Sequence, residues 1–448
     1  MNNMKILFIS LGCDKNLVDS EHMLGLLVEH GFEITDSEED AEVIVINTCC
    51  FIHDAKEESI QNILEMAKYR TAGSCKVLLV TGCMAERYRD EIIEEIPEVD
   101  AVLGTNSYDK ILDAIQDVLG GDRFQEYADL KGLPKIDAQR VVTTGGHYEY
   151  LKIAEGCDKH CTYCIIPKLR GKFRSVPMER LIAQAEDMAE QGVKELILVA
   201  QETTVYGKDL YGKKSLHILL KKLCEIRGIR WIRILYCYPE EIYDELIETI
   251  RDEKKICHYL DIPIQHASDR ILKRMGRRTS KQELIDIVGK LRKEIPDIVL
   301  RTTLITGFPG ETEEDHEELK EFVDEMEFDR LGVFTYSPEE NTPAAEMADQ
   351  VPEEVKEERR DELMELQQEI SYDRGQDRIG QELLVMIEGK VADESAYIGR
   401  TYGDAPKVDG YIFVQTGELL MTGDFAKVRV TGALEYDLIG VLSDEYTE

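Results

Sequence analysis

The sequence lacks several features that would each place it in a different class of protein. It has no run of about 18 consecutive apolar residues, so we expect no membrane-spanning helix. Its first ten residues show no basic segment followed by a long apolar stretch, so we expect no export signal. Eleven cysteines without such a signal favour a reducing compartment, where thiols serve metals or chemistry rather than disulfides. We therefore expect a cytoplasmic protein with no membrane partner.

Positive charge is also scarce. The chain has 54 Lys and Arg residues against 90 Asp and Glu residues, which gives a formal net charge of -36. A field of this sign repels phosphate backbones and attracts cations, metals and basic proteins. A solvated surface without a specific partner explains the same number equally well. Net charge alone does not choose between these interpretations.

The pattern of apolar runs divides the 448 residues, more than one hydrophobic core usually covers, into three domains. Residues 1–120 alternate short apolar runs with amphipathic segments, which predicts a small βαβ domain with a parallel sheet. Residues 121–146 carry Gly, Pro and scattered charges and are expected to form a linker. Six further strand and helix units in residues 147–375 predict a complete or partial α/β barrel. Five short strands in residues 376–448 predict a small β-barrel, so the fold class is α/β with a terminal β-barrel.

Three cysteines follow the first predicted strand of the α/β barrel at C-x3-C-x2-C spacing: Cys157, Cys161 and Cys164, called the motif trio below. The chemistry of such a barrel sits at the carboxyl ends of its strands, where this loop begins. A 4Fe-4S cluster takes one thiolate per iron, so three thiolates leave one iron open to a substrate or cofactor. The alternative is a zinc site with His160 as fourth ligand, although no second C-x2-C pair exists to complete a zinc ribbon.

The motif trio, with Tyr163 before its last cysteine, resembles the signature of the radical S-adenosylmethionine enzymes. The resemblance implies that the open iron is chelated by the amino and carboxylate groups of S-adenosylmethionine. One electron from the cluster then breaks the sulfonium bond and gives a 5'-deoxyadenosyl radical, which removes hydrogen from an unactivated carbon. An external electron donor is therefore expected.

Residues at other predicted strand ends are candidates for binding this cofactor. Gln201, Glu202 and Thr203 follow the second strand, where the resemblance implies contact with the methionine amino group, although the usual Gly-Gly is absent. Gln265 and His266 follow a later strand. Structural roles are the alternative, because glutamines can simply cap strand ends.

The segment "ITGFPGET" offers two glycines at another strand end. Gly307 and Gly310 would let the backbone approach an adenine closely. The same segment is also typical of a loop that enters a helix, with Thr312 as the N-cap.

Three more cysteines, called the sheet trio below, each follow a predicted strand of the first domain: Cys13, Cys49 and Cys83. The carboxyl ends of parallel strands gather at one edge of an open sheet, so we expect these thiols to converge and to hold a second cluster. Free cysteines are also often buried as small hydrophobes, and Cys50 competes with Cys49 as a ligand. The others are expected to be structural: Cys75, which precedes its strand, Cys224, Cys237 and Cys257.

Two such trios, a radical S-adenosylmethionine barrel and a terminal β-barrel together resemble the methylthiotransferases, whose terminal barrel is a TRAM domain. The resemblance covers nearly the whole chain. It implies two 4Fe-4S clusters, of which one makes the radical and the other supplies or carries sulfur, and a second S-adenosylmethionine that provides the methyl group. The net reaction replaces C–H with C–S–CH3 and needs a sulfur source that the sequence does not identify.

Three segments, residues 11–21, 47–60 and 404–410, resemble one branch of that family. This branch modifies an aspartate β-carbon on protein twelve of the small ribosomal subunit. Two positions depart from the expected pattern: Cys50 replaces a small residue, and Lys407 replaces an acid. Neither departure touches the chemistry, but Lys407 bears on how a substrate docks.

The charge of the terminal barrel is an independent argument about the substrate. Residues 379–448 contain five Lys and Arg residues against thirteen Asp and Glu residues, where an RNA-binding barrel should present a basic face. An acidic barrel suits a basic ribosomal protein, free or in the assembling small subunit. Basic stretches at residues 168–174 and 272–278 keep open a second interpretation, modification of an adenosine in transfer RNA. A third is a non-enzymatic iron-sulfur or zinc protein that binds ribosomes.

Overall fold

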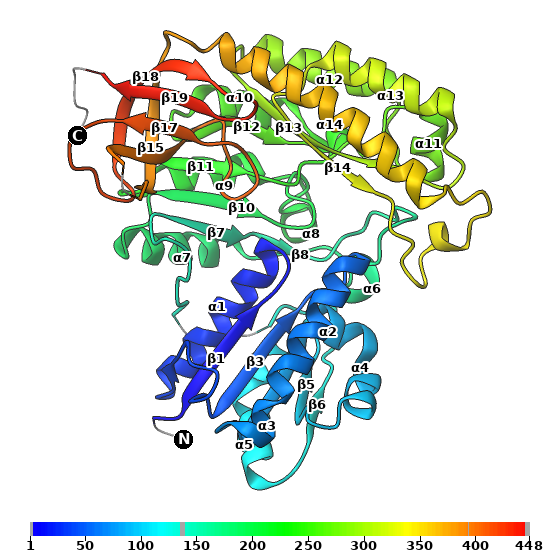
Figure 1. Ribbon diagram of the computed structural model, residues 1–448, viewed down its shortest axis with the longest axis vertical. Coiled ribbons are helices and arrows are strands. Elements are labelled where there is room, and N and C mark those ends of the chain that lie inside the picture. The colour runs from blue at the N-terminus through cyan, green and yellow to red at the C-terminus, as the bar shows by residue number, and fades with distance from the viewer. Residues whose placement is uncertain (1–2, 135–138, 393, 444–448) are drawn as a thin grey trace. The chain divides into compact units, whose positions relative to one another are not determined.

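The computed structural model describes residues 3–134, 139–392 and 394–443, which fold as two compact units (Figure 1). The first unit comprises Met1–Thr143, Ala154–Val176 and Ser337–Ala345, and the second comprises Thr144–Ile153, Pro177–Tyr336 and Glu346–Glu448. The loop that carries the motif trio thus belongs to the unit of the N-terminal sheet, and the terminal barrel belongs to the unit of the second sheet. Residues 135–138 of the expected linker and residues 444–448 of the expected terminal domain lie outside the described ranges.

A six-stranded parallel sheet forms the centre of the first unit, in the order β2-β1-β3-β4-β5-β6. Its strands are β1 (Lys5–Ser10), β2 (Glu33–Ile34), β3 (Val43–Thr48), β4 (Val77–Gly82), β5 (Ala101–Leu103) and β6 (Phe124–Glu126). Its helices are α1 (Asp14–Glu29), α2 (His53–Ala67), α3 (Tyr69–Ala72), α4 (Cys83–Glu95) and α5 (Ile111–Gly120), with the 3-10 turn η1 (Tyr108–Lys110).

Apolar side chains cover both faces of this sheet because successive residues of a strand point to opposite sides. Val43 and Val45 of β3 pack with α1 and α5, whereas Ile44 and Ile46 pack with α2 and α4. Such continuous apolar strands are typical of parallel sheets buried on both faces. The predicted α/β domain is confirmed.

Strand β6 differs from the sequence analysis, since it falls within the segment expected to be a linker. Phe124 pairs with Ala101 of β5, which makes β6 an edge strand of the first sheet. Its three residues, of which only one is apolar, are too few for an alternating pattern to identify.

The second unit contains a parallel sheet in the order β14-β13-β12-β11-β10-β7. Its strands are β7 (Tyr148–Lys152), β10 (Glu195–Val199), β11 (Trp231–Ile234), β12 (Ile256–Asp261), β13 (Val299–Thr306) and β14 (Arg330–Thr335). The helices that follow are α7 (Met178–Glu190), α8 (Lys208–Tyr211), α9 (Leu216–Cys224), α10 (Asp244–Asp252), α11 (Asp269–Arg274), α12 (Lys281–Glu294), α13 (Glu313–Met326) and α14 (Glu353–Gln376), with the 3-10 turn η2 (Pro239–Glu241). The 3-10 turn η3 (Pro343–Glu346) lies at the end of the segment Ser337–Ala345 of the first unit. Neighbouring strands of the second sheet follow one another in the sequence, and β7 and β14 are its two edge strands. The sheet is therefore the partial form of the predicted barrel.

A closed β-barrel ends the second unit, in the order β15-β16-β17-β19-β18. Its strands are β15 (Glu382–Lys390), β16 (Ala396–Thr401), β17 (Ile412–Gln415), β18 (Phe425–Ala433) and β19 (Leu438–Leu442). Inward-facing side chains such as Val385, Ile412 and Val428 form its core. The predicted terminal barrel is confirmed.

Buried ion pairs join this barrel to the second sheet. Glu195 of β10 accepts from Arg233 of β11 at 2.8 Å and from Arg400 of β16 at 2.7 Å. All three side chains are fully buried. In a buried environment, a carboxylate that binds one guanidinium through each oxygen has its charge compensated. A buried arginine without this carboxylate would lower the stability of the fold.

The segment at residues 404–410 makes two further links to the sheet. Arg330 of β14 donates to Asp404 at 2.5 Å, and Tyr259 of β12 donates to Asp409 at 2.7 Å. Burial would raise the pKa of Asp404, but the charge of Arg330 and the hydrogen bonds from Thr401 and Arg330 together lower that pKa below its usual value. Lys407, by contrast, is exposed and has a left-handed backbone, with φ of 68°.

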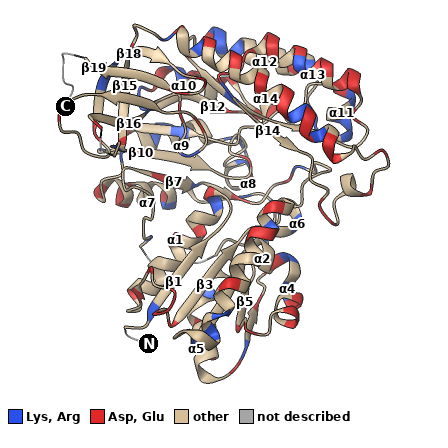
Figure 2. Ribbon diagram, viewed as in Figure 1, with Lys and Arg blue, Asp and Glu red and all other residues tan. Residues whose placement is uncertain are grey.

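The helices of the described ranges include none that is both long and apolar enough to cross a membrane. Helix α14 is not apolar enough to cross a membrane, because it carries acidic and basic residues along its length (Figure 2).

Candidate active site

The sheet trio lies at the carboxyl edge of the first sheet. Cys13 precedes α1, Cys49 follows β3, and Cys83 begins α4 directly after β4. Burial raises the pKa of the Cys49 thiol to about 12, and the charges of Cys83 and Cys13 contribute to the rise. The charges of the three thiols therefore act on one another, and their binding of one cluster stays a prediction. Cys75 lies at the opposite end of β4, where its thiol contacts the carbonyl oxygen of Val77 at 3.4 Å.

Two glycines in the left-handed region bring the loops of the sheet trio together. Gly12 has φ of 85°, and a Cβ there would lie 2.5 Å from the Cβ of Cys49 and 2.8 Å from its Sγ. Gly82 has φ of 94°, and a Cβ there would lie 2.3 Å from Oδ1 of Asn47 and 2.4 Å from the carbonyl oxygen of Thr48. Any side chain would collide at both positions, so the close approach of these loops requires glycine.

We expect Gly12→Ala to impair iron binding by the sheet trio, because the added methyl group would displace the Cys49 thiol. After reconstitution, the iron content should fall from about eight toward about four atoms per chain. Gly121→Ala is the matched control, since Gly121 also has a left-handed backbone, with φ of 102°, but nothing lies within 4 Å of an added Cβ. Equal iron in the Gly12→Ala and unmodified proteins would show that this contact does not position a ligand.

Asparagine side chains hold the same loops. Nδ2 of Asn16 donates to the carbonyl oxygens of Leu11 at 3.0 Å and Thr48 at 2.9 Å, which precede Cys13 and Cys49 closely in the chain. Nδ2 of Asn47 donates to the carbonyl oxygen of Asn16 at 2.9 Å. The contact of Asn16 with Thr48 spans 32 residues and that of Asn47 with Asn16 spans 31 residues, so no local pattern in the sequence indicates them.

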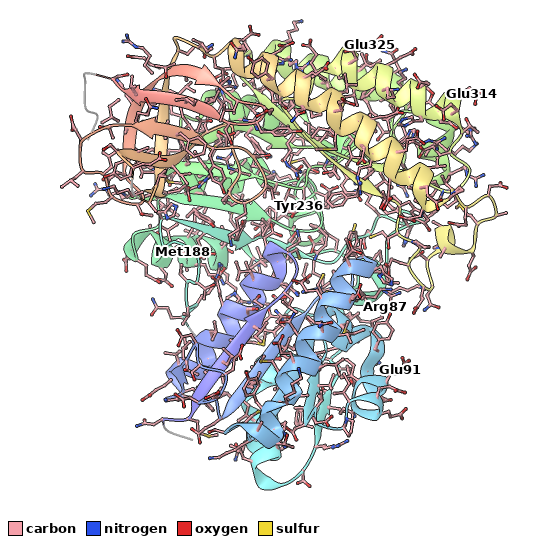
Figure 3. All side chains as sticks on the ribbon, in the orientation of Figure 1. Arg87, Glu91, Met188, Tyr236, Glu314 and Glu325 are labelled. Atoms are coloured by element: carbon pink, nitrogen blue, oxygen red, sulfur yellow. The ribbon has the colours of Figure 1, made fainter. Side chains whose placement is uncertain are left out.

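Cys50 is fully buried next to Cys49. Its side chain packs in a hydrophobic core with Ile63, and burial raises the pKa of its thiol. Arg87, labelled in Figure 3, donates to the Cys50 carbonyl oxygen at 3.2 Å and to Glu339 at 2.8 Å. The charge of Cys83 adds to the rise in the pKa of the Cys50 thiol, as it does for Cys49, so Cys50 stays a competing ligand of the sheet trio.

The motif trio occupies a loop closed by its own small sheet. Strand β8 (Ala154–Glu155) pairs with β9 (Arg174–Ser175), and the Cys157 amide donates to the carbonyl oxygen of Gly171 at 3.1 Å. Burial raises the pKa of the Cys164 thiol, and the charges of Cys161 and Cys157 add to this rise. These three thiols therefore also interact. His160, the fourth ligand that a zinc site would need, is exposed.

The loop of the motif trio packs in the core of the first unit. Helix α6 (Ile166–Arg170) follows Cys164, and the adjacent Ile165 and Leu169 share a hydrophobic core with Met84 and Cys83. The hydroxyl of Thr105 donates to the carbonyl oxygen of Leu169 at 2.6 Å. Both trios thus belong to one compact unit.

The donors at these two places fit iron-sulfur clusters. All six cysteines lie within the described residues, and none of them forms a disulfide there. Among the described residues, no three His, Cys, Asp or Glu side chains are grouped to hold a single metal ion. The thiolates of a cluster bind different irons and need not meet at one point.

Tyr163, also a cofactor candidate, lies in the loop of the motif trio in the first unit. The other cofactor candidates belong to the second unit, and those after β10 have local partners. The Thr203 hydroxyl is fully buried and donates to the carbonyl oxygen of Leu235 at 2.8 Å. Its amide donates to the carbonyl oxygen of Tyr236, labelled in Figure 3, at 3.1 Å. Glu202 is also buried and accepts from the Thr204 amide at 2.9 Å. These contacts hold the loop after β10 against the end of β11, whereas Gln201 is only half-buried.

Gln265 has the strongest features of a cofactor contact. Its φ of 73° is unusual for a residue with a side chain, and such backbone costs on the order of 1–3 kcal/mol and clusters at functional sites. Its backbone bridges to β13, since its amide donates to Thr303 at 2.9 Å and its carbonyl accepts from Ile305 at 2.8 Å. Its Oε1 is buried and has no hydrogen-bond partner within the described residues.

His266 has a structural environment instead. It is fully buried, and its Nδ1 accepts from the amides of Ala267 at 3.0 Å and Ser268 at 2.9 Å. The ring proton is therefore assigned to Nε2, which lies 3.6 Å from Glu311. Glu311 in turn accepts from Arg359 at 3.0 Å.

Packing accounts for both glycines of the "ITGFPGET" segment. A Cβ at Gly307 would lie 2.1 Å from the Lys356 side chain, and one at Gly310 would lie 2.9 Å from the Arg274 guanidinium. Thr312 caps α13 in a capping box with Asp315, as the structural alternative predicts. An adenine contact at Gly307 stays a prediction.

The two basic stretches turn much of their charge inward. Arg170 and Arg174 are buried, and Arg277 is buried and donates to the carbonyl oxygen of Pro263 at 2.8 Å. The exposed cations of these stretches are Lys168, Lys172, Lys273 and Arg278. Several basic residues of these stretches therefore bond inside the protein and are not part of an RNA-binding surface, the role that the sequence also allowed.

Comparisons with known proteins agree with this architecture. Family models match residues 5–104 (Uncharacterized protein family UPF0004), 151–323 (Radical SAM superfamily) and 379–442 (TRAM domain). The solved structure of the radical S-adenosylmethionine methyltransferase TsrM from Kitasatospora setae is similar, with a TM-score of 0.56, 13% identity and 77% of each chain covered. The structure of OxsB has a TM-score of 0.51 and 14% identity, covering 82% of this chain and 56% of that one. These likenesses support the fold.

Curated relatives are similar over almost the whole sequence. A protein of Lachnoclostridium phytofermentans named ribosomal protein uS12 methylthiotransferase RimO is 66% identical over 437 residues, covering 98% of this chain and 99% of the relative. A protein of the same name from Clostridium perfringens is 52% identical over 449 residues, covering 99% of each. At this identity and coverage, the chain belongs to the RimO family of methylthiotransferases.

Proposed function

We propose that this enzyme inserts a methylthio group at the β-carbon of an aspartate in ribosomal protein uS12. The reaction replaces C–H with C–S–CH3 and uses S-adenosylmethionine twice, as radical source and as methyl donor. The observation that carries the proposal is the presence of both cysteine trios in one compact unit of a chain that is 66% identical to a uS12 methylthiotransferase. Sulfur insertion needs one site that activates the carbon and another that holds the sulfur.

We assign one 4Fe-4S cluster to each trio. The motif trio would hold the cluster whose open iron binds S-adenosylmethionine, and the sheet trio would hold the cluster that carries sulfur. When bound, the clusters supply one-electron chemistry and sulfur ligation that no side chain provides. The protein contributes the six thiols, the glycines that bring the loops of the sheet trio together, and Gln265 as a polar contact for the cofactor. An electron donor and a sulfur source must come from outside the chain.

The charge of the terminal barrel supports a basic protein substrate. The relatives are named for uS12, which favours this substrate over an adenosine of transfer RNA. The inward-facing arginines of the two basic stretches also weaken the RNA interpretation. We place the reaction in the cytoplasm, on free uS12 or on the assembling small subunit.

The decisive experiment offers both substrates to one enzyme. Reconstituted protein is incubated anaerobically with a reductant, a sulfur source, methyl-labelled S-adenosylmethionine, small ribosomal subunits and bulk transfer RNA. We expect label in uS12, with the mass gain of a methylthio group on one aspartate. Label in nucleosides would overturn the assignment of the substrate. Stoichiometric zinc without acid-labile sulfide would overturn the enzyme itself.

A further inference from the structure

Arg170 is a buried cation at the end of α6 to which the proposed reaction gives no role. Its side chain is 2% exposed. One nitrogen, Nη1, donates to Asp19 of α1 at 2.7 Å and to Glu155 of β8 at 3.3 Å. Glu155 is two residues before Cys157. Arg170 therefore connects the helix that follows Cys13 with the base of the loop that carries the motif trio.

The other nitrogen, Nη2, reaches the sheet trio itself. It donates to Sγ of Cys83 at 3.6 Å and to Oδ1 of Asn16 at 2.5 Å. Because Oδ1 of Asn16 accepts this bond, its Nδ2 is left to donate to the carbonyl oxygens of Leu11 and Thr48. One guanidinium thus contacts one cysteine of the sheet trio directly and orients the amide that holds the loops of the other two.

A hydrogen bond to a ligating sulfur changes the cluster that the sulfur holds. It offsets part of the negative charge of the thiolate, so the reduced cluster is stabilised and its reduction potential rises. We propose, resting on the proposed function, that Arg170 is a positioning residue that holds the loops of both trios and raises the reduction potential of the sheet-trio cluster through its bond to Cys83.

The test isolates one cluster at a time. In a full-length protein with alanine at all three motif-trio cysteines, the sheet trio holds the remaining cluster. We expect Arg170→Gln to move the potential of its one-electron couple to a more negative value in a titration followed by electron paramagnetic resonance. The reduction equilibrium constant should fall roughly tenfold, which is about 59 mV. Arg170→Lys keeps the positive charge but not the two-pronged geometry, so a smaller shift in the same direction is expected.

Two controls separate this effect from a general loss of structure. In the converse background, with alanine at the sheet trio, Arg170→Gln should shift the potential of the motif-trio cluster much less, because Arg170 reaches the loop of that trio through Glu155, whereas in the unmodified protein it bonds directly to the Cys83 sulfur of the sheet trio. Arg174→Gln removes a buried arginine that donates to the carbonyl oxygens of Arg170 and Lys172, and it should shift the sheet-trio potential much less.

The outcomes distinguish the two proposals. An unshifted potential in an Arg170 variant that retains its four irons overturns the role of Arg170 and leaves the proposed function standing. If Arg170→Gln fails to retain iron, the potential of the Arg170→Lys protein is the test instead, and an unshifted potential again overturns the role of Arg170. If the motif-trio alanine protein binds no iron while Arg170 is intact, the two-cluster assignment fails, and the role of Arg170 fails with it.

Discussion

Alanine at any cysteine of the motif trio should abolish cleavage of S-adenosylmethionine, whereas alanine at any cysteine of the sheet trio should leave cleavage intact and stop sulfur insertion. The first change removes one of three thiolates around the cluster that receives the cofactor. The second change affects the other cluster, and about four irons per chain should remain. The measurement is anaerobic: 5'-deoxyadenosine by chromatography, methylthiolated uS12 by mass, and iron content of each variant.

Cys75→Ala is the matched control for this experiment. Cys75 is a buried free cysteine of the same sheet, but it lies before β4 rather than after it. Both products should form at normal yield in this variant. Cys50→Ala tests the competing ligand and should also retain both products if Cys49 is the ligand that follows β3. Undiminished methylthiolation by a Cys13→Ala protein would remove the sheet trio from the mechanism.

The convergence of the sheet trio could be predicted from the sequence because it depends on local pattern alone. Each cysteine follows a strongly apolar run, and parallel strands bring their carboxyl ends to one edge. Knowing which residues end strands is then enough to group thiols that are about 35 residues apart. The same reasoning located the strands of the second sheet and of the terminal barrel.

The network that supports the cysteines could not be predicted in this way. Arg170 contacts Asp19 from 151 residues away and Cys83 from 87 residues away, and no periodicity links them. The basic stretch that contains Arg170 was interpreted as a possible surface for RNA, yet its arginines are buried. A charged residue contributes no apolar signal, so its burial depends on partners that only the folded chain supplies.

The segment at residues 404–410 shows a different limit. Its resemblance to one family branch drew attention to substrate choice, but in the structure Asp404 and Asp409 contact Arg330 and Tyr259 of the second sheet. The segment resembles one branch of the family, but its carboxylates have a structural role, because they bind the terminal barrel to the second sheet. Lys407 and Val408 of this segment are exposed instead.

Glu195→Ala should be among the most destabilising single changes in the second unit. It would take the shared carboxylate from Arg233 and Arg400, each fully buried, and leave Arg400 with Glu388 as its ion-pair partner. Breaking a buried pair in this way costs on the order of 3–5 kcal/mol. The single tryptophan of the chain reports on this place, because Trp231 of β11 packs edge-on against Phe425 of the barrel, with ring centroids 4.8 Å apart. Urea unfolding followed by tryptophan fluorescence measures the loss.

Two further proteins separate lost charge pairing from lost volume. Glu418→Ala removes an exposed carboxylate of the same barrel, so the unfolding midpoint should change little. A protein with Glu195, Arg233 and Arg400 all replaced by apolar residues of similar size should recover part of the stability, since a buried ion group can be exchanged for apolar packing at little cost. Glu388 loses Arg400 in this protein but keeps its contact with His147. If Glu195→Ala unfolds at the same urea concentration as the unmodified protein, these pairs do not hold the barrel to the sheet. If the triple replacement is as unstable as Glu195→Ala, the directional hydrogen bonds, rather than the stranded charges, account for the loss.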